Sequence, residues 1–98
     1  MEEDLLTIIN HYGIGNQLKY IHSEYFELDE AIFECEHGYN YSPTQLGRTY
    51  ENHIAEEIAD VMVMLKQFQY YYDISNEHIE KIMREKIKRQ LERIEKDK

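Results

Sequence analysis

The residues that decide the fold are Glu56–Leu65, with the sequence Glu-Glu-Ile-Ala-Asp-Val-Met-Val-Met-Leu. The five apolar residues from Val61 to Leu65 point in every direction around an α-helix, because successive residues are about 100° apart. A helix that is apolar all round is buried on most of its sides. Glu57 and Asp60 stand within this apolar surface, and an ionised carboxylate is costly to bury without a partner. The stretch therefore predicts a buried helix whose carboxylates need cations, protonation or a water-filled cleft.

Three further helical segments flank this one, and the breaks between them are short turns or a single loop. We expect helices over Glu2–His11, over Asn16–His37, from Pro43 or Thr49 to about Tyr72, and after the turn Asp73–Ser75. Asn16 is the predicted N-cap of the second helix, Gly38 its stop, and Ser75 or Asn76 the cap of the fourth. The chain is thus predicted to be a single all-α domain over residues 1–98, an antiparallel four-helix bundle.

The apolar residues of the second helix indicate which side is buried and which side is available to a partner. Spacings of three and four residues define a heptad seam, which comprises Leu18, Ile21, Tyr25, Leu28, Ile32 and Cys35. Phe26 and Phe33 lie away from this seam. Unless the short first helix covers them, they form an exposed apolar patch, which favours assembly as a homodimer or homotetramer.

Charge is the most informative feature of the composition. The 98 residues carry a formal net charge of -9, from 20 acidic and 11 basic residues. The charge is unevenly distributed, because Met1–Glu80 holds 16 acidic and 3 basic residues and Lys81–Lys98 holds 4 and 8. An acidic protein is poorly suited to bind a nucleic-acid polymer, so we expect no such partner. We also expect no membrane span and no signal peptide. The single Cys35 agrees with a cytoplasmic location.

Two pairs of carboxylates with the same spacing predict a metal site. Glu24 and Glu27 on the second helix, like Glu57 and Asp60 on the third, are three residues apart and share one side of their helix. In an antiparallel hairpin the two pairs come to a similar height, and four carboxylates suit Mg²⁺ or Mn²⁺. The alternative is a solvated acidic face. Zinc and di-iron sites are disfavoured, because one cysteine and one Glu-x-x-His, Glu34–His37, do not supply their ligands.

At these residues the chain resembles the MazG-like nucleotide pyrophosphohydrolases, a family of the all-α NTP pyrophosphatases. The stretch Ser23–Leu28 is similar to the family's Glu-Glu-x-x-Glu motif, and Glu56–Val61 is similar to its Glu-x-x-Asp motif. The resemblance extends from about Asn16 to Ile94. Ser23 stands where the family often has a first glutamate, and the segment between the two motifs is long for the family.

The resemblance implies Mg²⁺-dependent hydrolysis of a nucleoside triphosphate to its monophosphate and pyrophosphate. It implies these roles: Glu24, Glu27, Glu57 and Asp60 as metal ligands, Glu24 or Glu27 orienting the attacking water, Lys86 and Arg89 contacting phosphates, and Asn16 and Gln17 contacting the base. Two alternatives remain open. One is a non-enzymatic helical oligomer or regulatory module with a decayed site, and the other is a base-specific dUTP or dCTP pyrophosphatase.

Overall fold

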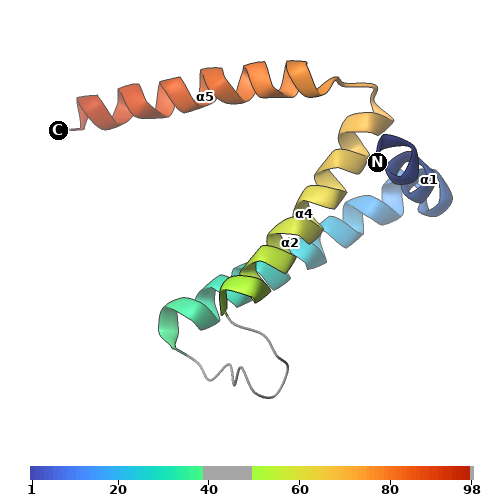
Figure 1. Ribbon diagram of the computed structural model, residues 1–98, viewed down its shortest axis with the longest axis horizontal. Coiled ribbons are helices and arrows are strands. Elements are labelled where there is room, and N and C mark those ends of the chain that lie inside the picture. Colours follow the sequence, from blue (N-terminus) through green and yellow to red (C-terminus); the bar gives the residue numbers. More distant parts are fainter. Residues whose placement is uncertain (39–49, 98) are drawn as a thin grey trace.

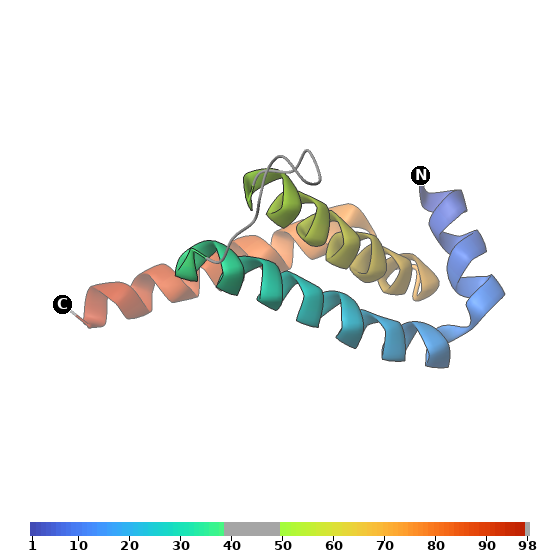
Figure 2. The same cartoon turned by 90° about the horizontal axis from the view of Figure 1, so that it is seen from below.

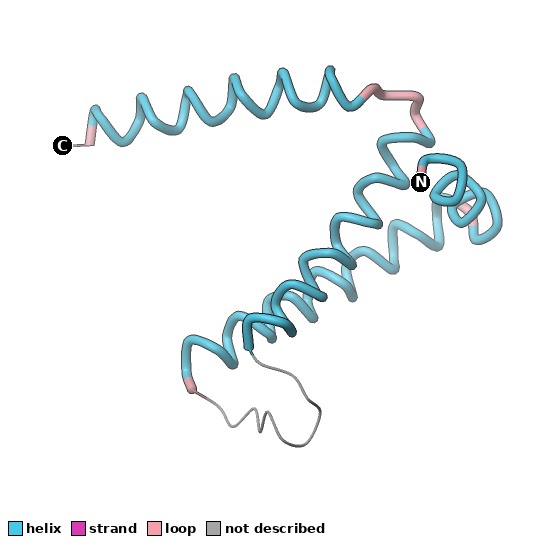
Figure 3. Tube along the Cα trace, in the orientation of Figure 1, coloured by secondary structure: helices cyan, strands magenta, loops and turns pink. Residues whose placement is uncertain are grey.

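The computed structural model describes residues 1–38 and 50–97, which form four helices and no strand (Figures 1 and 3). The helices are α1 (Glu2–Tyr12), α2 (Ile14–His37), α4 (Tyr50–Tyr71) and α5 (Asn76–Lys96). The all-α prediction is confirmed. The loop expected after Gly38, and both proposed starts of the third helix, Pro43 and Thr49, lie outside the described residues.

The two ends of α2 show one error and one success of the sequence prediction. The helix begins at Ile14, after Gly13 with φ 88°, so Asn16 is not its cap. Asn16 lies instead in the first turn, where its side-chain amide donates a 2.7 Å hydrogen bond to the carbonyl of Tyr12. At the other end, Gly38 adopts the predicted left-handed conformation with φ 65°, which glycine adopts without steric cost.

Helices α2 and α4 run antiparallel and side by side, and α1 lies across the end where α2 begins and α4 finishes (Figures 1 and 2). The apolar core of the described residues is small. Its buried members are Leu5, Ile9, Ala31 and Met64. Polar residues complete the packing, because the buried Gln17 amide of α2 donates a 2.8 Å hydrogen bond to Gln67 Oε1 of α4. This bond fixes the height of one helix against the other.

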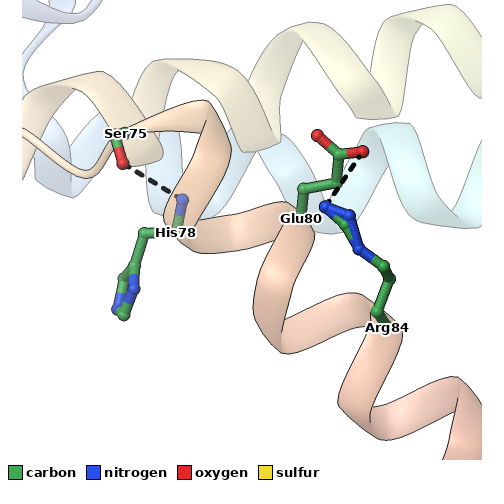
Figure 4. A network of polar contacts seen from close by, with 4 residues as sticks. All are labelled: Ser75, His78, Glu80 and Arg84. Carbon is green, nitrogen blue, oxygen red and sulfur yellow. Dashed lines mark hydrogen bonds and ion pairs between the residues drawn. The ribbon is translucent and has the colours of Figure 1, made fainter.

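Helix α5 leaves this packed unit. Its N-terminus is formed as predicted, since the Ser75 hydroxyl accepts a 3.1 Å hydrogen bond from the backbone N–H of His78 (Figure 4). The helix then extends away from α2 and α4 (Figure 1), and none of its Cα atoms lies within 8 Å of one in the other three described helices. The expected four-helix bundle is thus corrected in one respect: within one chain, three of the four helices pack on one another.

The buried side of α2 also differs from the predicted seam. The residues that face α4 are Gln17, Glu24 and Ala31, which are seven residues apart. Half of the predicted seam is exposed, with Leu18, Tyr25 and Ile32 at 51%, 65% and 42%. The other half, Ile21, Leu28 and Cys35, is half-buried. Phe26 and Phe33 are exposed as well, so α1 does not cover them. No helix in the described part of the chain is long and apolar enough to span a membrane.

Candidate metal centre

The antiparallel pairing of α2 and α4 brings the four predicted carboxylates together. Glu24, Glu27, Glu57 and Asp60 each offer one oxygen, and these four oxygens all lie within 4.8 Å of one another. The arrangement follows from the height of the two helices, which the Gln17–Gln67 hydrogen bond sets two turns away. The sequence prediction that the two pairs converge is therefore confirmed.

The two inner carboxylates are the unusual members of this cluster. Glu24 is 6% exposed and Glu57 is 9% exposed, whereas Glu27 and Asp60 are exposed to solvent. The Oε2 atoms of Glu24 and Glu57 are buried and have no hydrogen-bond partner. An orphaned buried oxygen is costly, and natural proteins retain few of them. Two such oxygens in one cluster therefore point to a ligand that satisfies both.

Each inner carboxylate is held by a side chain one helical turn before it. The Tyr20 hydroxyl hydrogen-bonds to Glu24, and His53 Nε2 lies 3.3 Å from Glu57 Oε1. These contacts occupy one oxygen of each carboxylate and leave the other free for an ion. They have the form of the outer contacts that orient ligands in protein metal sites.

Burial and mutual repulsion act together on the ionisation of the inner pair. Desolvation raises the pKa of Glu24, and the charges of Glu27 and Asp60 raise it further against the opposing hydrogen bond from Tyr20. Desolvation likewise raises the pKa of Glu57, to which Glu27 and Asp60 add, while His53 lowers it. A divalent cation reverses this effect, since it favours the ionised form of every carboxylate around it.

The donor set fits a hard divalent ion. Four carboxylates from two helices supply only oxygen atoms, which Mg²⁺ and Mn²⁺ prefer. Neither Cys35 nor any histidine is a member of the cluster, so the set is unlike that of a structural zinc site. The described residues therefore form a helical protein with an acidic cluster that is able to hold a divalent ion.

A cavity of about 520 Å³ adjoins the cluster on the side of α1. Glu24 and Asp60 form part of its wall, and the predicted base contacts Asn16 and Gln17 lie in the same wall. The remaining lining residues are Ile8, Tyr12, Tyr20, Val63, Met64 and Gln67. The structure thus brings six of the eight predicted site residues into one region.

The other two predicted site residues lie elsewhere. Lys86 and Arg89 belong to α5, which extends away from the cluster, and their role as phosphate contacts stays a prediction. Ser23 is exposed and is not a member of the cluster, so the four carboxylates converge without a ligand at this position.

Sequence reasoning missed Tyr20 and His53. Both stand four residues before a cluster carboxylate, a spacing that places two side chains on the same side of a helix. This spacing was a usable signal for both residues. Gln67 carried no such signal, because its partner Gln17 is 50 residues away.

No protein-family model matches this chain, and neither the curated proteins nor the solved structures contain a match. The similarity to MazG-like enzymes therefore rests on the motifs alone.

Proposed function

We propose that this protein binds Mg²⁺ or Mn²⁺ at the acidic cluster and hydrolyses nucleoside triphosphates to the monophosphate and pyrophosphate. The observation that carries the proposal is the pair of orphaned, buried oxygens on Glu24 and Glu57. These two residues belong to a cluster in which one oxygen of each of four carboxylates lies within 4.8 Å of the others. The motif resemblance supplies the reaction. The adjoining cavity supplies room for a base and sugar, since its volume is within the range of small-molecule sites.

The chain's own residues have distinct tasks in this mechanism. Glu24 and Glu57, fixed by Tyr20 and His53, would hold the ion from the buried side. When bound, a divalent ion polarises a phosphoryl oxygen and lowers the pKa of a water. Glu27 and Asp60, which are exposed to solvent, would hold the ion from the side on which a triphosphate approaches. A carboxylate that the ion does not fully engage takes the proton of the attacking water, and Glu24 and Glu27 are the candidates.

The cavity wall suits recognition of a nucleobase. Tyr12 and Tyr20 offer aromatic surface, and the amides of Asn16 and Gln17 offer donors and acceptors. Gln17 is held by Gln67, which is 2% exposed, so one of these amides is already fixed in position. A fixed amide discriminates between bases better than a mobile one, because a mismatched base leaves it unpaired.

A panel of the ribo- and deoxynucleoside triphosphates, incubated with Mg²⁺ or Mn²⁺ and with EDTA, tests the proposal. The products are separated as monophosphate, diphosphate, pyrophosphate and phosphate. We expect monophosphate and pyrophosphate in equal amounts, only when the metal is present. Turnover of dUTP or dCTP alone would select the base-specific alternative. Release of single phosphates would refute the proposed bond.

The matched variants are Asp60→Asn within the cluster and Asp73→Asn outside it, which change the formal charge equally. Asp73 lies in the turn before α5 and is not a member of the cluster. We expect Asp60→Asn to reduce turnover by about 100-fold or more, as loss of an essential electrostatic group does. Asp73→Asn should retain activity. Equal activity of the two variants would exclude the cluster as the catalytic site.

A second candidate is a metal-binding helical module without catalytic activity. The observation that favours it is the distance of Lys86 and Arg89 from the cluster, which leaves the site without a basic side chain from α5 in one chain. This candidate predicts metal-dependent stabilisation and no turnover of any nucleotide in the panel.

A further inference from the structure

The α2–α4 pair has an apolar surface that stays exposed among the residues that the structure describes. On α2, three residues lie about a quarter-turn from the side that faces α4: Leu18, Tyr25 and Ile32. On α4, three residues lie about a quarter-turn from the side that carries Glu57: Ile58, Met62 and Leu65. Because the two helices are antiparallel, both sets turn toward the same side of the pair. We call these six residues the lateral apolar face; they are between 42% and 65% exposed.

The lateral apolar face is on the opposite side of the pair from the cavity. The same geometry turns Glu27 and Asp60 toward α1, whose residues line the cavity with Asn16. The lateral apolar face is therefore separate from the candidate metal centre, and a partner that covers it does not block the cluster.

Helix α5 has an apolar surface of matching character. Its outward-facing apolar residues repeat every three or four positions and form one stripe, Ile79, Met83, Ile87, Leu91 and Ile94. The last four are 53–58% exposed, and α5 contains no buried residue. Most of the stability of a helix in a protein comes from packing of its apolar side. The exposed stripe leaves α5 without that contribution, so a surface that covers the stripe would stabilise the helix.

The turn before α5 directs this helix away from its own chain. Asn76 Oδ1 accepts hydrogen bonds from Lys66 Nζ at 2.6 Å, Gln69 Nε2 at 2.8 Å and the Tyr70 hydroxyl at 3.2 Å. Gln69 Nε2 also donates a 2.9 Å bond to the carbonyl of Ile74. This network anchors the start of α5 to the end of α4 and opposes folding α5 back onto its own chain, which favours a receiving surface on another molecule.

Charge identifies which molecule that is. The lateral apolar face is bordered by the exposed acidic residues Asp29, Glu36 and Glu51. One side of the α5 stripe is basic and carries Lys86, Arg89 and Arg93. The other side is mixed, because Arg84 there forms an ion pair with Glu80 at 3.5 Å. Two lateral apolar faces placed together would bring like charges into contact, whereas α5 brings opposite ones.

We propose that α5 of a second copy of this chain packs on the lateral apolar face, and that two copies exchange their α5 helices in this way. A two-fold symmetric dimer satisfies both surfaces of both chains at once, because each copy gives one α5 and receives one. Each α2–α4 pair then gains the additional helix that a bundle requires. Lys86 and Arg89 become partners of acidic residues at the edge of the face.

Sedimentation of the whole protein at tens of micromolar tests this exchange. The test variants are Met62→Asp on the lateral apolar face and Leu91→Asp on the α5 stripe, both at exposed positions. We expect the wild type to be a dimer and each variant to raise the dimer dissociation constant by about tenfold or more, as truncation of interface anchors does. Circular dichroism confirms that each variant keeps its helices.

Phe26→Asp is the matched control, since Phe26 is 60% exposed on the outer side of α2 and away from the lateral apolar face. It should leave the dimer unchanged. A dimer insensitive to Leu91→Asp would show that two lateral apolar faces pack together, and a dimer insensitive to Met62→Asp would show that two α5 helices pair. Either result, or a monomeric wild type, would overturn the proposal. Concentrated salt should weaken the dimer, because it screens the charges at the edge.

Discussion

Replacing Glu57 by glutamine should make the metal-free protein more stable and the metal-loaded protein less stable. Glu57 is 9% exposed, has one orphaned oxygen and shares the cluster with three other carboxylates. Glutamine keeps its shape, removes its charge and adds an N–H that is able to donate to Glu24. The substitution therefore separates the electrostatic cost of the cluster from its packing.

The magnitude follows from the separation of the oxygens. Two unit charges 4.8 Å apart repel by about 1–3.5 kcal/mol for effective dielectric constants between 80 and 20. Loss of the His53 contact offsets part of this gain. In EDTA at neutral pH we expect the free energy of unfolding to rise by about 1–3 kcal/mol. For a domain of this size that corresponds to a rise in Tm of roughly 5–20 °C.

With metal bound, the Glu57→Gln variant should be less stable than the wild type. An ion that binds only the folded state contributes about 2.7 kcal/mol at a hundred times its dissociation constant. We expect thermal unfolding followed by circular dichroism to show this stabilisation with MnCl₂ in the wild type, and little of it in Glu57→Gln. Glu30→Gln, an exposed site outside the cluster, makes the same charge change and should move Tm little in either condition. A Glu57→Gln variant that is less stable in EDTA and still responds fully to Mn²⁺ would refute the metal centre.

Four further predictions concern the metal-free protein and its helix ends. The pKa of Glu24 and of Glu57 is raised in the folded state. Their contribution to stability in EDTA should therefore be largest below the ordinary carboxyl pKa of about 4.3 and should fall as pH rises through the raised value. Urea titrations across pH should show this fall in the wild type and not in the Glu24→Gln/Glu57→Gln double variant. Gln67→Leu should cost about 1–3 kcal/mol, because it leaves the buried Gln17 amide without its partner, and a smaller loss measured by urea unfolding would show that water replaces the bond. Ser75→Ala should cost about 1 kcal/mol through loss of the cap on α5, visible as reduced helicity at 222 nm, whereas Ser75→Asp should retain it. Gly38→Ala should cost about 1 kcal/mol or more because φ is 65°, and an unchanged urea midpoint would mean that α2 ends differently.

The features that sequence predicted well are those that a single helix determines. The spacing of Glu24 and Glu27, and of Glu57 and Asp60, fixes which side of the helix each pair occupies, and chain length then fixes their height in a hairpin. The ends marked by Gly38 and Ser75 were predicted for the same reason, since their conformations depend on local chemistry. Each of these features needed no knowledge of a partner helix.

The features that sequence missed depend on which surface meets which. Hydrophobic spacing selected Leu18, Tyr25 and Ile32 as the buried side of α2, but the side against α4 carries Gln17, Glu24 and Ala31. The pattern identified a real apolar surface and assigned it to the wrong neighbour, because periodicity does not distinguish a core within the chain from an interface. The all-round apolar α4 was misjudged in the same way, since Ile58, Met62 and Leu65 remain exposed in one chain.

These two misses and the acidic cluster have a common physical basis. Leu5, Ile9 and Met64 are the large buried apolar side chains of the described residues, and each contributes about 1.5–3 kcal/mol. This is little apolar burial with which to offset two desolvated carboxylates and the ordering of four helices. The proposed ion would remove the cost of the carboxylates, and α5 from the proposed second copy would add apolar burial where the described chain lacks it. One side of α2 cannot both pack its apolar residues on α4 and place Glu24 beside Glu57. Burying Leu18, Tyr25 and Ile32 against α4 would turn Glu24 away from Glu57. The orientation of α2 therefore places the cluster between α2 and α4 and leaves the lateral apolar face exposed.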